Sequence, residues 1–513
     1  MLALYTDRLS ARSGDTVALH ASATQGPCRL EIARVGAGRT IVLNLDNLTV
    51  GDHPIPAHAD RDGCGWPAAL EIKIGADWPS GYYDLRLTDA AGEEAHHFVV
   101  VKPPLGAPTA RTALVLATNT YHAYNYFGGA NAYCDVEALM SRRARLPEAM
   151  AGAIGVLSTR RPFPPQIVAQ APDVPRLVNV RPRGFEERPF AGDPTWPGRR
   201  TRSPYDGSAG FINKWEHAFV AWAEGEGVAL DYFTDHDLDI EPELLADYPV
   251  LTVVGHSEYW TAEARDAVEA WIDKGGRFAI FSGNTAFWKV RFEDEGGRFI
   301  CHKWNGFEAD PVAAAQPAQG THLWSHKIFD RPEAAMTGLT FLFGGYHRLG
   351  ACVARGDAGY TVYDERHWAL AGADLFYGDV IGAGVNFLGY ENDGCRFSFG
   401  DDGRLKPVAT LGVPETLEII AIAPCALGET AVEGYPPLIP PERLDVIAQD
   451  VFGRAGPDAE DRLLRGHAVM ASFSRGLGEV FNGGTTEWAH GLAAADPYVR
   501  TITRNVLKRF GAY

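Results

Sequence analysis

Polar side chains follow four apolar runs of the sequence, each at the point where the run ends. NTYHAYNYFGG follows TALVLAT, TDHDLD follows VALDYF, HSEYW follows VLTVVG, and NTAFW follows RFAIFSG. The carboxyl ends of neighbouring parallel strands lie along one edge of a sheet, where open α/β sheets bind their ligands. The sequence therefore predicts one site at that edge, drawn from Asn119, Tyr121, His122, Tyr124, Asn125, Tyr126, Asp235, His236, Asp237, His256, Ser257, Glu258, Tyr259, Asn284 and Trp288.

Spacing disfavours three kinds of site. Ser257 lies in GHSEY, where Tyr259 stands in place of the second glycine that the strained elbow of a serine hydrolase requires. No cysteine follows a predicted strand beside a histidine. FGGANAY and IGAGVNF lack the lysine and the spacing of a phosphate-binding loop. We therefore expect neither a serine or cysteine nucleophile nor a P-loop.

A metal site is a further chemistry that these segments allow. His256 and Glu258 are two residues apart on a turn, so both could reach one ion, or one could bind it while the other orients its partner. Structural roles stay open beside this one. Glu258 could cap the helix that follows, Asn284 could hold a turn, and the tyrosines could simply pack with their hydroxyls bonded. Asp235 and Asp237 are more typical of helix caps than of metal ligands.

Two regions with different patterns must position these residues. Residues 1–105 contain short alternating strands, such as DTVALHAS, CRLEIARV and GYYDLRLTD, which predict an antiparallel β-sandwich. After the linker PPLGAP, strands and helices alternate over residues 106–513, which predicts a doubly wound α/β domain. Further strands are expected at GVNFLGYE, LEIIAIAP, AVMASFS and GEVFNGG, and a final helix at YVRTITRNVLKRF. Residues 160–210 are loop-like, and a loop of that length usually covers a site.

Composition excludes several classes of protein. The 513 residues are 46% hydrophobic and carry a formal net charge of −18, which indicates a globular chain of about two to four domains. The acidic balance disfavours nucleic acid and anionic membranes as partners, and no apolar stretch of about 18 residues predicts a membrane span. Seven scattered cysteines never form a CxxC pair, and no signal peptide is visible. We expect a cytoplasmic protein without a disulfide framework.

The ordered blocks of the α/β region resemble a known family. NTYHAYNYFGG, WEHAFVAWAEGEGVALDYFTDHDLD, GHSEYW, SGNTAFW, GYENDG and RGLGEVFNGGTTEWAHGL are similar to the C-terminal domain of the N,N-dimethylformamidase large (beta) subunit, with GHSEYW and SGNTAFW the most specific. The resemblance runs from about residue 111 to the end and is not decisive for residues 1–105. It implies a glutamine-amidotransferase-like α/β fold and a mononuclear ferric iron (Fe3+) held by two tyrosines and a glutamate.

The resemblance also assigns roles to individual residues. Glu258 would be the glutamate ligand with His256 beside it, and Tyr121 or Tyr124 would supply one tyrosine. Asn284 would position the amide, Glu391 would be the catalytic glutamate, and Lys303 would support the site. Phenolate and carboxylate are hard anionic ligands that suit ferric iron, which acidifies a bound water and polarises a carbonyl.

The chain departs from the family pattern at the second tyrosine. The matching stretch is AIGVLSTRRPFPPQ, in which Leu157 occupies the expected position. Either Tyr124, Tyr133 or Tyr205 supplies that ligand, or the iron site is incomplete. 

The sequence as a whole favours a metal-dependent hydrolase, with iron as the expected metal, that cleaves carbon–nitrogen bonds in small amides. One alternative is a metal-independent hydrolase in which Glu391 and His256 form the acid–base pair. The other is a non-catalytic protein that binds a ligand such as a carbohydrate. The amidase hypothesis requires Glu391 to lie near Glu258. Two adjacent carboxylates repel each other unless a cation lies between them. A homo-oligomer is expected from the aromatic-rich loops, and a separate small subunit is an open possibility of the resemblance.

Overall fold

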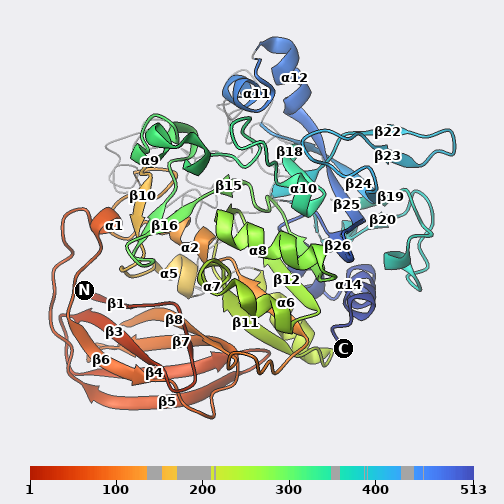
Figure 1. The fold of residues 1–513 in the computed structure, drawn as a ribbon. Helices are drawn as coiled ribbons and strands as arrows, with labels where there is room; N and C mark the ends of the chain where they lie inside the picture. The colour runs from red at the N-terminus through yellow and green to blue at the C-terminus, as the bar shows by residue number, and fades with distance from the viewer. Residues whose placement is uncertain are drawn as a thin grey trace, which may run out of the picture.

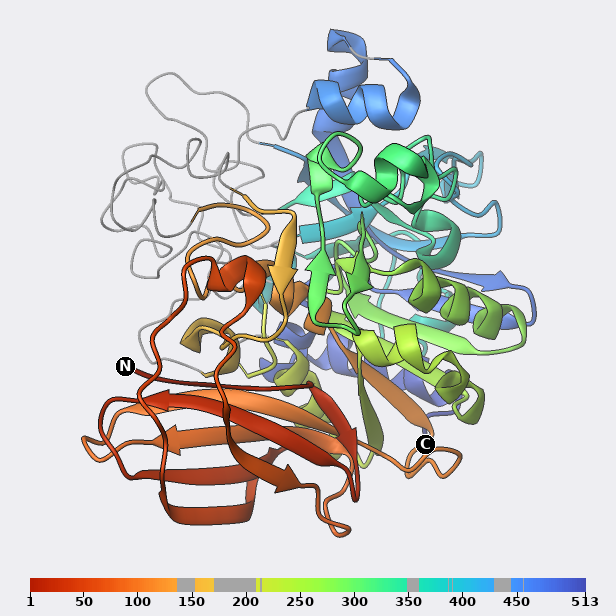
Figure 2. The same ribbon diagram turned by 60° about the vertical axis from the view of Figure 1, so that its left-hand side comes forward.

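The computed structural model describes residues 1–135, 153–169, 209–212, 215–347, 359–385, 387–389, 391–428, 444–454 and 456–513. Most of the predicted 160–210 loop, and with it Tyr205, lies outside these residues. The chain forms a mixed α/β structure with two small sheets at one end, antiparallel except for the parallel pair of β2 and β8, and a large mixed sheet beside them (Figure 1). The turned view in Figure 2 keeps the N-terminal strands at that end.

The N-terminal strands form two sheets that share one hydrophobic core. The first sheet has the order β1-β3-β6 and the second β2-β8-β7-β4-β5. Inward residues of both, among them Leu19, Ile32 and Val99, belong to a single buried cluster. The strands are β1 Leu2–Thr6, β2 Ser10–Arg12, β3 Thr16–Ala23, β4 Cys28–Val35, β5 Arg39–Leu48, β6 Ala68–Lys73, β7 Gly81–Thr88 and β8 Glu94–Lys102, with the short helix α1 at Ala59–Asp62.

The large sheet is parallel in one half and antiparallel in the other. Its main order is β11-β9-β12-β14-β26-β25-β24-β18-β21, and the pairs from β11 to β26 are parallel. The parallel strands are β9 Thr112–Leu116, β11 Leu230–Thr234, β12 Val250–Gly255, β14 Arg277–Ser282 and β26 Gly478–Asn482. The others are β18 Thr340–Tyr346, β19 Tyr360–Val362, β20 Val380–Ile381, β21 Glu391–Gly394, β24 Glu418–Ala426 and β25 Arg465–Arg475.

Helices cover both faces of the parallel half, and successive residues of β9 point alternately toward the two layers of helices. Leu114 and Leu116 lie in one core cluster with residues of α6, α13 and α14, whereas Ala113 and Val115 lie in a second cluster with residues of α8. A strand buried on both faces is apolar throughout, which is why TALVLAT has no polar alternation. The main helices are α2 Thr118–Tyr124, α6 Glu216–Gly225, α7 Asp235–Ile240, α8 Ala262–Asp273, α11 Leu444–Phe452, α12 Pro457–Leu464, α13 Trp488–Ala493 and α14 Pro497–Phe510.

Shorter elements complete the structure. The remaining strands are β10 Val156–Ser158, β13 Tyr259–Trp260, β15 Trp288–Lys289, β16 Arg291–Glu293, β17 Arg298–Ile300, β22 Phe397–Phe399 and β23 Leu405–Pro407. The remaining helices are α5 Pro165–Val168, α9 Pro311–Ala315 and α10 Ala334–Thr337, with 3-10 turns at Pro242–Asp247, Lys303–Asn305, Pro317–Gln319, Trp368–Leu370 and Ala383–Val385.

Most predicted elements have counterparts within a few residues, and one does not. The prediction of a strand over GVNFLGYE is wrong, because a 3-10 turn occupies Ala383–Val385 and the strand β21 begins only at Glu391. Gly382 and Gly389 on either side have positive φ angles, which bend the backbone out of an extended path. The antiparallel half of the large sheet was likewise not expected from a doubly wound pattern.

Buried ion pairs join the N-terminal sheets to the large sheet. The Lys102 ammonium donates to Asp237 at 2.6 Å and to Glu241 at 3.0 Å. Arg12 contacts the same Glu241 carboxylate, and Ser10 donates to Asp237 at 2.6 Å. The carboxylates come from α7 and the residue after it, so the strand β8 is fixed against the parallel half of the sheet.

The cysteines in the described part of the chain are residues 28, 64, 134, 301, 395 and 425, which are all buried and are not joined to one another by disulfides. No helix in the described part of the chain is long and apolar enough to cross a membrane.

Candidate active site

The backbone after β12 carries His256, Ser257 and Glu258 to the carboxyl edge of the sheet. The Thr120 hydroxyl, on α2, donates to the His256 carbonyl at 2.7 Å and accepts the Glu258 N–H at 3.3 Å. The Ser257 hydroxyl accepts the Trp260 indole N–H at 3.0 Å. Glu258 does not cap α8, because Thr261 is the N-cap.

One imidazole atom bridges two buried carboxylates. His256 Nε2 lies 3.1 Å from Glu258 Oε2 and 2.7 Å from Glu391 Oε2. The three side chains are 1%, 3% and 6% exposed, so their mutual interactions are weakly screened. The structure therefore brings Glu391, the start of β21, to the residues that follow β12.

The charges of this group depend on one another. Burial opposes the charge of His256, but Glu391 and Glu258 together raise its pKa to about 10. Burial also works against the Glu258 carboxylate, yet the His256 cation lowers its pKa. For Glu391, burial dominates over His256 and raises the pKa. The site thus holds an imidazolium, an ionised Glu258 and a second carboxyl group that accepts a proton more readily than usual.

The Glu258 carboxylate is also held by aromatic donors. The Tyr133 hydroxyl lies 3.1 and 2.9 Å from its two oxygens, and the Trp288 indole N–H donates to Oε1 at 2.8 Å. The Tyr133 and Tyr259 hydroxyls are 2.5 Å apart. Burial raises the pKa of Tyr259 well above its ordinary value. Two phenol oxygens and one carboxylate therefore meet at a single point.

The tyrosines named from the sequence lie in different places. The Tyr121 hydroxyl donates to Glu216 at 2.7 Å rather than to Glu258. The Tyr124 ring lies 4.5 Å from that of Tyr133 and 5.7 Å from that of His256, centroid to centroid. Leu157 is fully buried in β10, where it pairs with Phe299. Tyr133, one of the predicted substitutes for the missing tyrosine, contacts Glu258 through its hydroxyl.

Lys303 supplies a second cation. Its Nζ lies 3.0 Å from the centroid of the Tyr133 ring and 5.2 Å from that of Trp288. Its charge also lowers the pKa of Glu258. A cation over the Tyr133 ring stabilises the phenolate form of that tyrosine.

Asn284 reaches the group from the turn after β14. Its side-chain amide donates to Glu391 Oε2 at 3.2 Å, and its φ angle of 52° places it in the left-handed region. Among the described residues, its Oδ1 is buried without a hydrogen-bond partner. The preceding Gly283 permits this contact, because a Cβ there would lie 2.4 Å from the Glu391 carbonyl oxygen. A small ligand at Glu391 would meet both an amide donor and an amide acceptor.

The other polar residues of the strand ends have structural roles. Asp237 forms a capping box with Thr234 at the start of α7, and Asp235 accepts the Asn119 backbone N–H at 3.0 Å. Burial lowers the pKa of His122 to about 3, and its ring packs against Phe163. These positions agree with the capping role expected for the two aspartates.

Sequence reasoning gave no role to two residues near Glu258. Tyr259 was listed as a strand-end candidate without a role, and its hydroxyl lies 2.5 Å from that of Tyr133, which contacts Glu258. The Trp288 indole N–H donates to Glu258, a role that its residue type and position in the sequence did not indicate. The side chains His256, Glu258, Asn284, Glu391 and Lys303 all lie in one cluster with Tyr133, whereas Tyr121 lies on Glu216.

Comparison with known proteins extends beyond the α/β region. A family model described as N,N-dimethylformamidase beta subunit-like, C-terminal matches residues 29–501, which include most of the N-terminal strands. A search of curated proteins finds no match. Because the matched segment covers nearly the whole chain, this protein belongs to the N,N-dimethylformamidase beta subunit-like, C-terminal family.

Proposed function

We propose that this chain hydrolyses carbon–nitrogen bonds in small amides, with Glu391 as the proton-transferring group. The observation that carries the proposal is the bridge from His256 Nε2 to Glu258 and Glu391. It satisfies the requirement that Glu391 lie near Glu258 with a cation between the two carboxylates. The family description supports the same reaction class.

The residues present suit a hard metal ion. The Tyr133 hydroxyl lies within hydrogen-bonding distance of both the Glu258 carboxylate and the Tyr259 hydroxyl. Phenol and carboxylate oxygens are the ligands that ferric iron prefers. The Lys303 cation lies over the Tyr133 ring and favours its phenolate. We propose that these three residues hold iron, with Tyr124 adjacent. When bound, the ion would polarise the amide carbonyl and acidify a water molecule.

The chain's own groups account for proton transfer. Glu391, whose pKa burial raises, can take a proton from water and return it to the departing amine. The His256 imidazolium stabilises the ionised form of Glu391, which is required before the first step and is restored by the second. Asn284 donates to Glu391 and still has one N–H and an unpartnered Oδ1 to orient the amide. Such donors stabilise the charge that develops on the carbonyl oxygen.

A metal-independent hydrolase remains a second candidate, and a specific contact favours it. His256 is itself the cation between the two carboxylates, so the pair of His256 and Glu391 is complete without an added ion. The two candidates differ in whether the activity depends on iron. A carbohydrate-binding protein is the third, and it predicts ligand binding without turnover.

The experiment is amine release from a panel of formamides and acetamides, with protein loaded with Fe3+ and protein stripped by chelation. The iron proposal predicts turnover in the loaded protein alone. Equal turnover in both supports the metal-independent hydrolase, and no turnover in either contradicts the hydrolase proposal. The variant Glu415→Gln, at an exposed position, is the control for Glu391→Gln.

We also propose that residues 1–105 form a β-sandwich and residues 106–513 a glutamine-amidotransferase-like domain, because the N-terminal sheets share one core of their own. Self-association, a separate small subunit and a cytoplasmic location stay predictions.

A further inference from the structure

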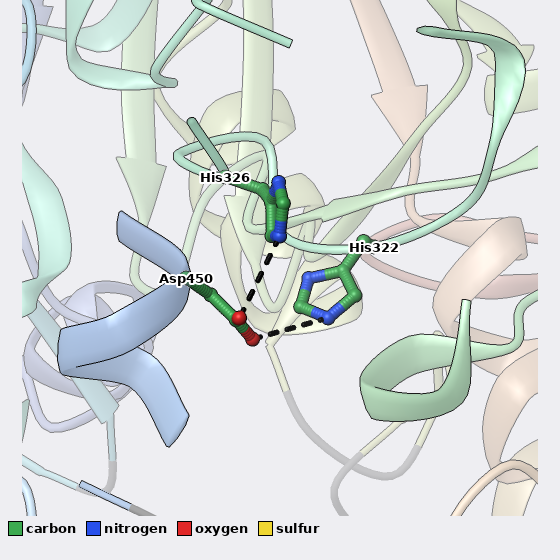
Figure 3. Close-up of side chains that lie close together, drawn as sticks. All are labelled: His322, His326 and Asp450. Carbon is green, nitrogen blue, oxygen red and sulfur yellow. Dashed lines mark ion pairs between the residues drawn. The ribbon is translucent and has the colours of Figure 1, made fainter. Parts of the chain in front are cut away.

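A second cluster of metal-ligand side chains lies beside the first site. It consists of His322, His326 and Asp450, whose nearest ligand atoms all lie within 4.8 Å of one another. His322 Nε2 is 3.5 Å from Asp450 Oδ2, and His326 Nε2 is 3.7 Å from Asp450 Oδ1. Figure 3 shows both rings turned toward the carboxylate, which comes from α11.

The backbone holds the two sides of this cluster together. The Lys327 N–H donates to the Asp450 carbonyl at 3.0 Å, and the Lys327 ammonium donates to the Gln449 carbonyl at 2.8 Å. Leu323, next to His322, forms a β-bridge with Trp288. The fold therefore sets the spacing of the three side chains before any ion binds.

The distances suit ligands of one ion better than a hydrogen-bonded group. Both N···O separations exceed the usual hydrogen-bond length, whereas two ligands of a tetrahedral ion at 2.0–2.1 Å lie about 3.4 Å apart. Phe307 packs on both rings, with centroids at 5.4 and 4.6 Å, so the rings are only 2% and 4% exposed. Burial lowers the pKa of His322 to about 3 and that of His326 to about 4, so both are neutral near pH 7.

We propose that His322, His326 and Asp450 bind a divalent first-row transition ion, with zinc the best match. Two neutral imidazoles and one carboxylate are a common zinc ligand set that leaves a position for water. The Asp450 side chain is 21% exposed, so water can reach that position. The site is separate from Glu258 and does not depend on the proposed amidase activity.

The tautomers of the two imidazole rings limit the affinity of this site for a metal ion. His322 Nδ1 accepts the Leu323 N–H at 2.8 Å, and His326 Nδ1 accepts the Ile328 N–H at 3.1 Å. These contacts aim Nε2 at Asp450 but place the ring proton on Nε2 in the metal-free protein. Binding at Nε2 moves each proton to Nδ1 and breaks the backbone contact. The Lys327 charge also opposes a cation near Asp450, so we expect a weaker site than one with free Nδ1 atoms.

An ion bound at this second site would affect the Glu258 site through Trp288. The Trp288 ring lies 6.4 Å from that of His322, and its indole N–H donates to Glu258. An ion on His322, His326 and Asp450 would tie α11 to the segment that pairs with Trp288. An ion that binds only the folded chain raises the melting temperature.

The test is calorimetric titration of Zn2+ into the chelator-stripped protein. Wild type and Glu258→Gln are both titrated, so that zinc bound at the Glu258 site is distinguished from zinc bound by His322, His326 and Asp450. We compare His322→Gln, His326→Gln and Asp450→Asn with Asp445→Asn, an exposed position on the same helix. Circular dichroism checks the fold of each variant. Asp450 is partly exposed, so Asp450→Asn decides the matter if a histidine variant does not fold.

We expect one zinc ion per chain that persists in Glu258→Gln. Its affinity should fall more than about tenfold in each of the three ligand variants and stay unchanged in Asp445→Asn. Zinc should raise the melting temperature of wild type and not that of Asp450→Asn. No zinc uptake by wild type, or equal uptake by wild type and Asp450→Asn, would overturn the proposal.

Discussion

The carboxylates of Glu258 and Glu391 contact the same atom, Nε2 of His256, at 3.1 and 2.7 Å. Two buried carboxylates this close repel each other unless a positive charge lies between them. The imidazolium supplies that charge. Because each charge is stabilised by the others, replacing any one of the three side chains leaves an uncompensated buried charge and lowers the free energy of unfolding. The arrangement accounts for the opposite pKa shifts of the two glutamates and for the high pKa of His256.

The pH dependence of stability should report this imidazolium. The pKa of His256 is about 10 in the folded chain and near 6.5 when unfolded. Its contribution is therefore complete below about pH 6.5 and is lost as the pH rises toward 10. We expect the free energy of unfolding to fall over that range, with a smaller slope in His256→Gln. Urea unfolding at several pH values measures it, and identical slopes in the two proteins would contradict the assignment.

Two tyrosine variants should differ in iron content. Tyr133→Phe removes a hydroxyl that contacts Glu258, so we expect the affinity for iron to fall about tenfold or more. Tyr121→Phe is the matched control, because its hydroxyl contacts Glu216. Elemental analysis after loading with Fe3+ gives the result. Loss of iron in Tyr121→Phe and retention in Tyr133→Phe would contradict this assignment and favour Tyr121, one of the two tyrosines that the family resemblance offered as a ligand.

Asn284→Ala should change the pH profile as well as the rate. The Asn284 amide stabilises the ionised form of Glu391, so its loss raises the pKa of that group. We expect kcat to fall about tenfold to a hundredfold and the acidic limb of its profile to move to higher pH. Steady-state rates on an active amide at a series of pH values provide the check. A lower rate with an unshifted limb would mean that Asn284 acts on the substrate alone.

Lys102→Met tests the connection between the N-terminal sheets and the large sheet. The Lys102 side chain is 5% exposed and that of Asp237 is fully buried, so removal of the cation leaves an uncompensated carboxylate. The expected loss of stability is about 3–5 kcal/mol. The control is Arg61→Ala, whose exposed pair with Asp62 should contribute little to the free energy of unfolding. Similar denaturation midpoints for wild type and Lys102→Met would show that this pair does not stabilise the junction.

The sequence predicted the parallel half of the sheet because that half depends on local pattern. TALVLAT, VLTVVG and RFAIFSG are apolar strands followed by polar turns, and their order in the chain places those turns together. His256, Glu258 and Asn284 could therefore be grouped before their positions were known. Glu391 came only from the family resemblance, because it starts an antiparallel strand that packs near residue 485.

Other contacts could not be read from local pattern. Tyr133 lies in a turn-rich segment after α2, and nothing in its spacing indicates that it reaches Glu258. His322 and His326 have the spacing of a helical pair but lie in an irregular segment, and their partner Asp450 is on α11, far along the chain. Such groups depend on tertiary packing, which periodicity does not encode.

The most direct test of the central claim is amine release from a small amide by wild type and Glu391→Gln, both loaded with Fe3+. Glutamine keeps the size of the side chain but cannot take a proton from water. We predict turnover in wild type and a loss of about a hundredfold or more in Glu391→Gln, with Glu415→Gln unchanged. Equal turnover in wild type and Glu391→Gln would contradict the account.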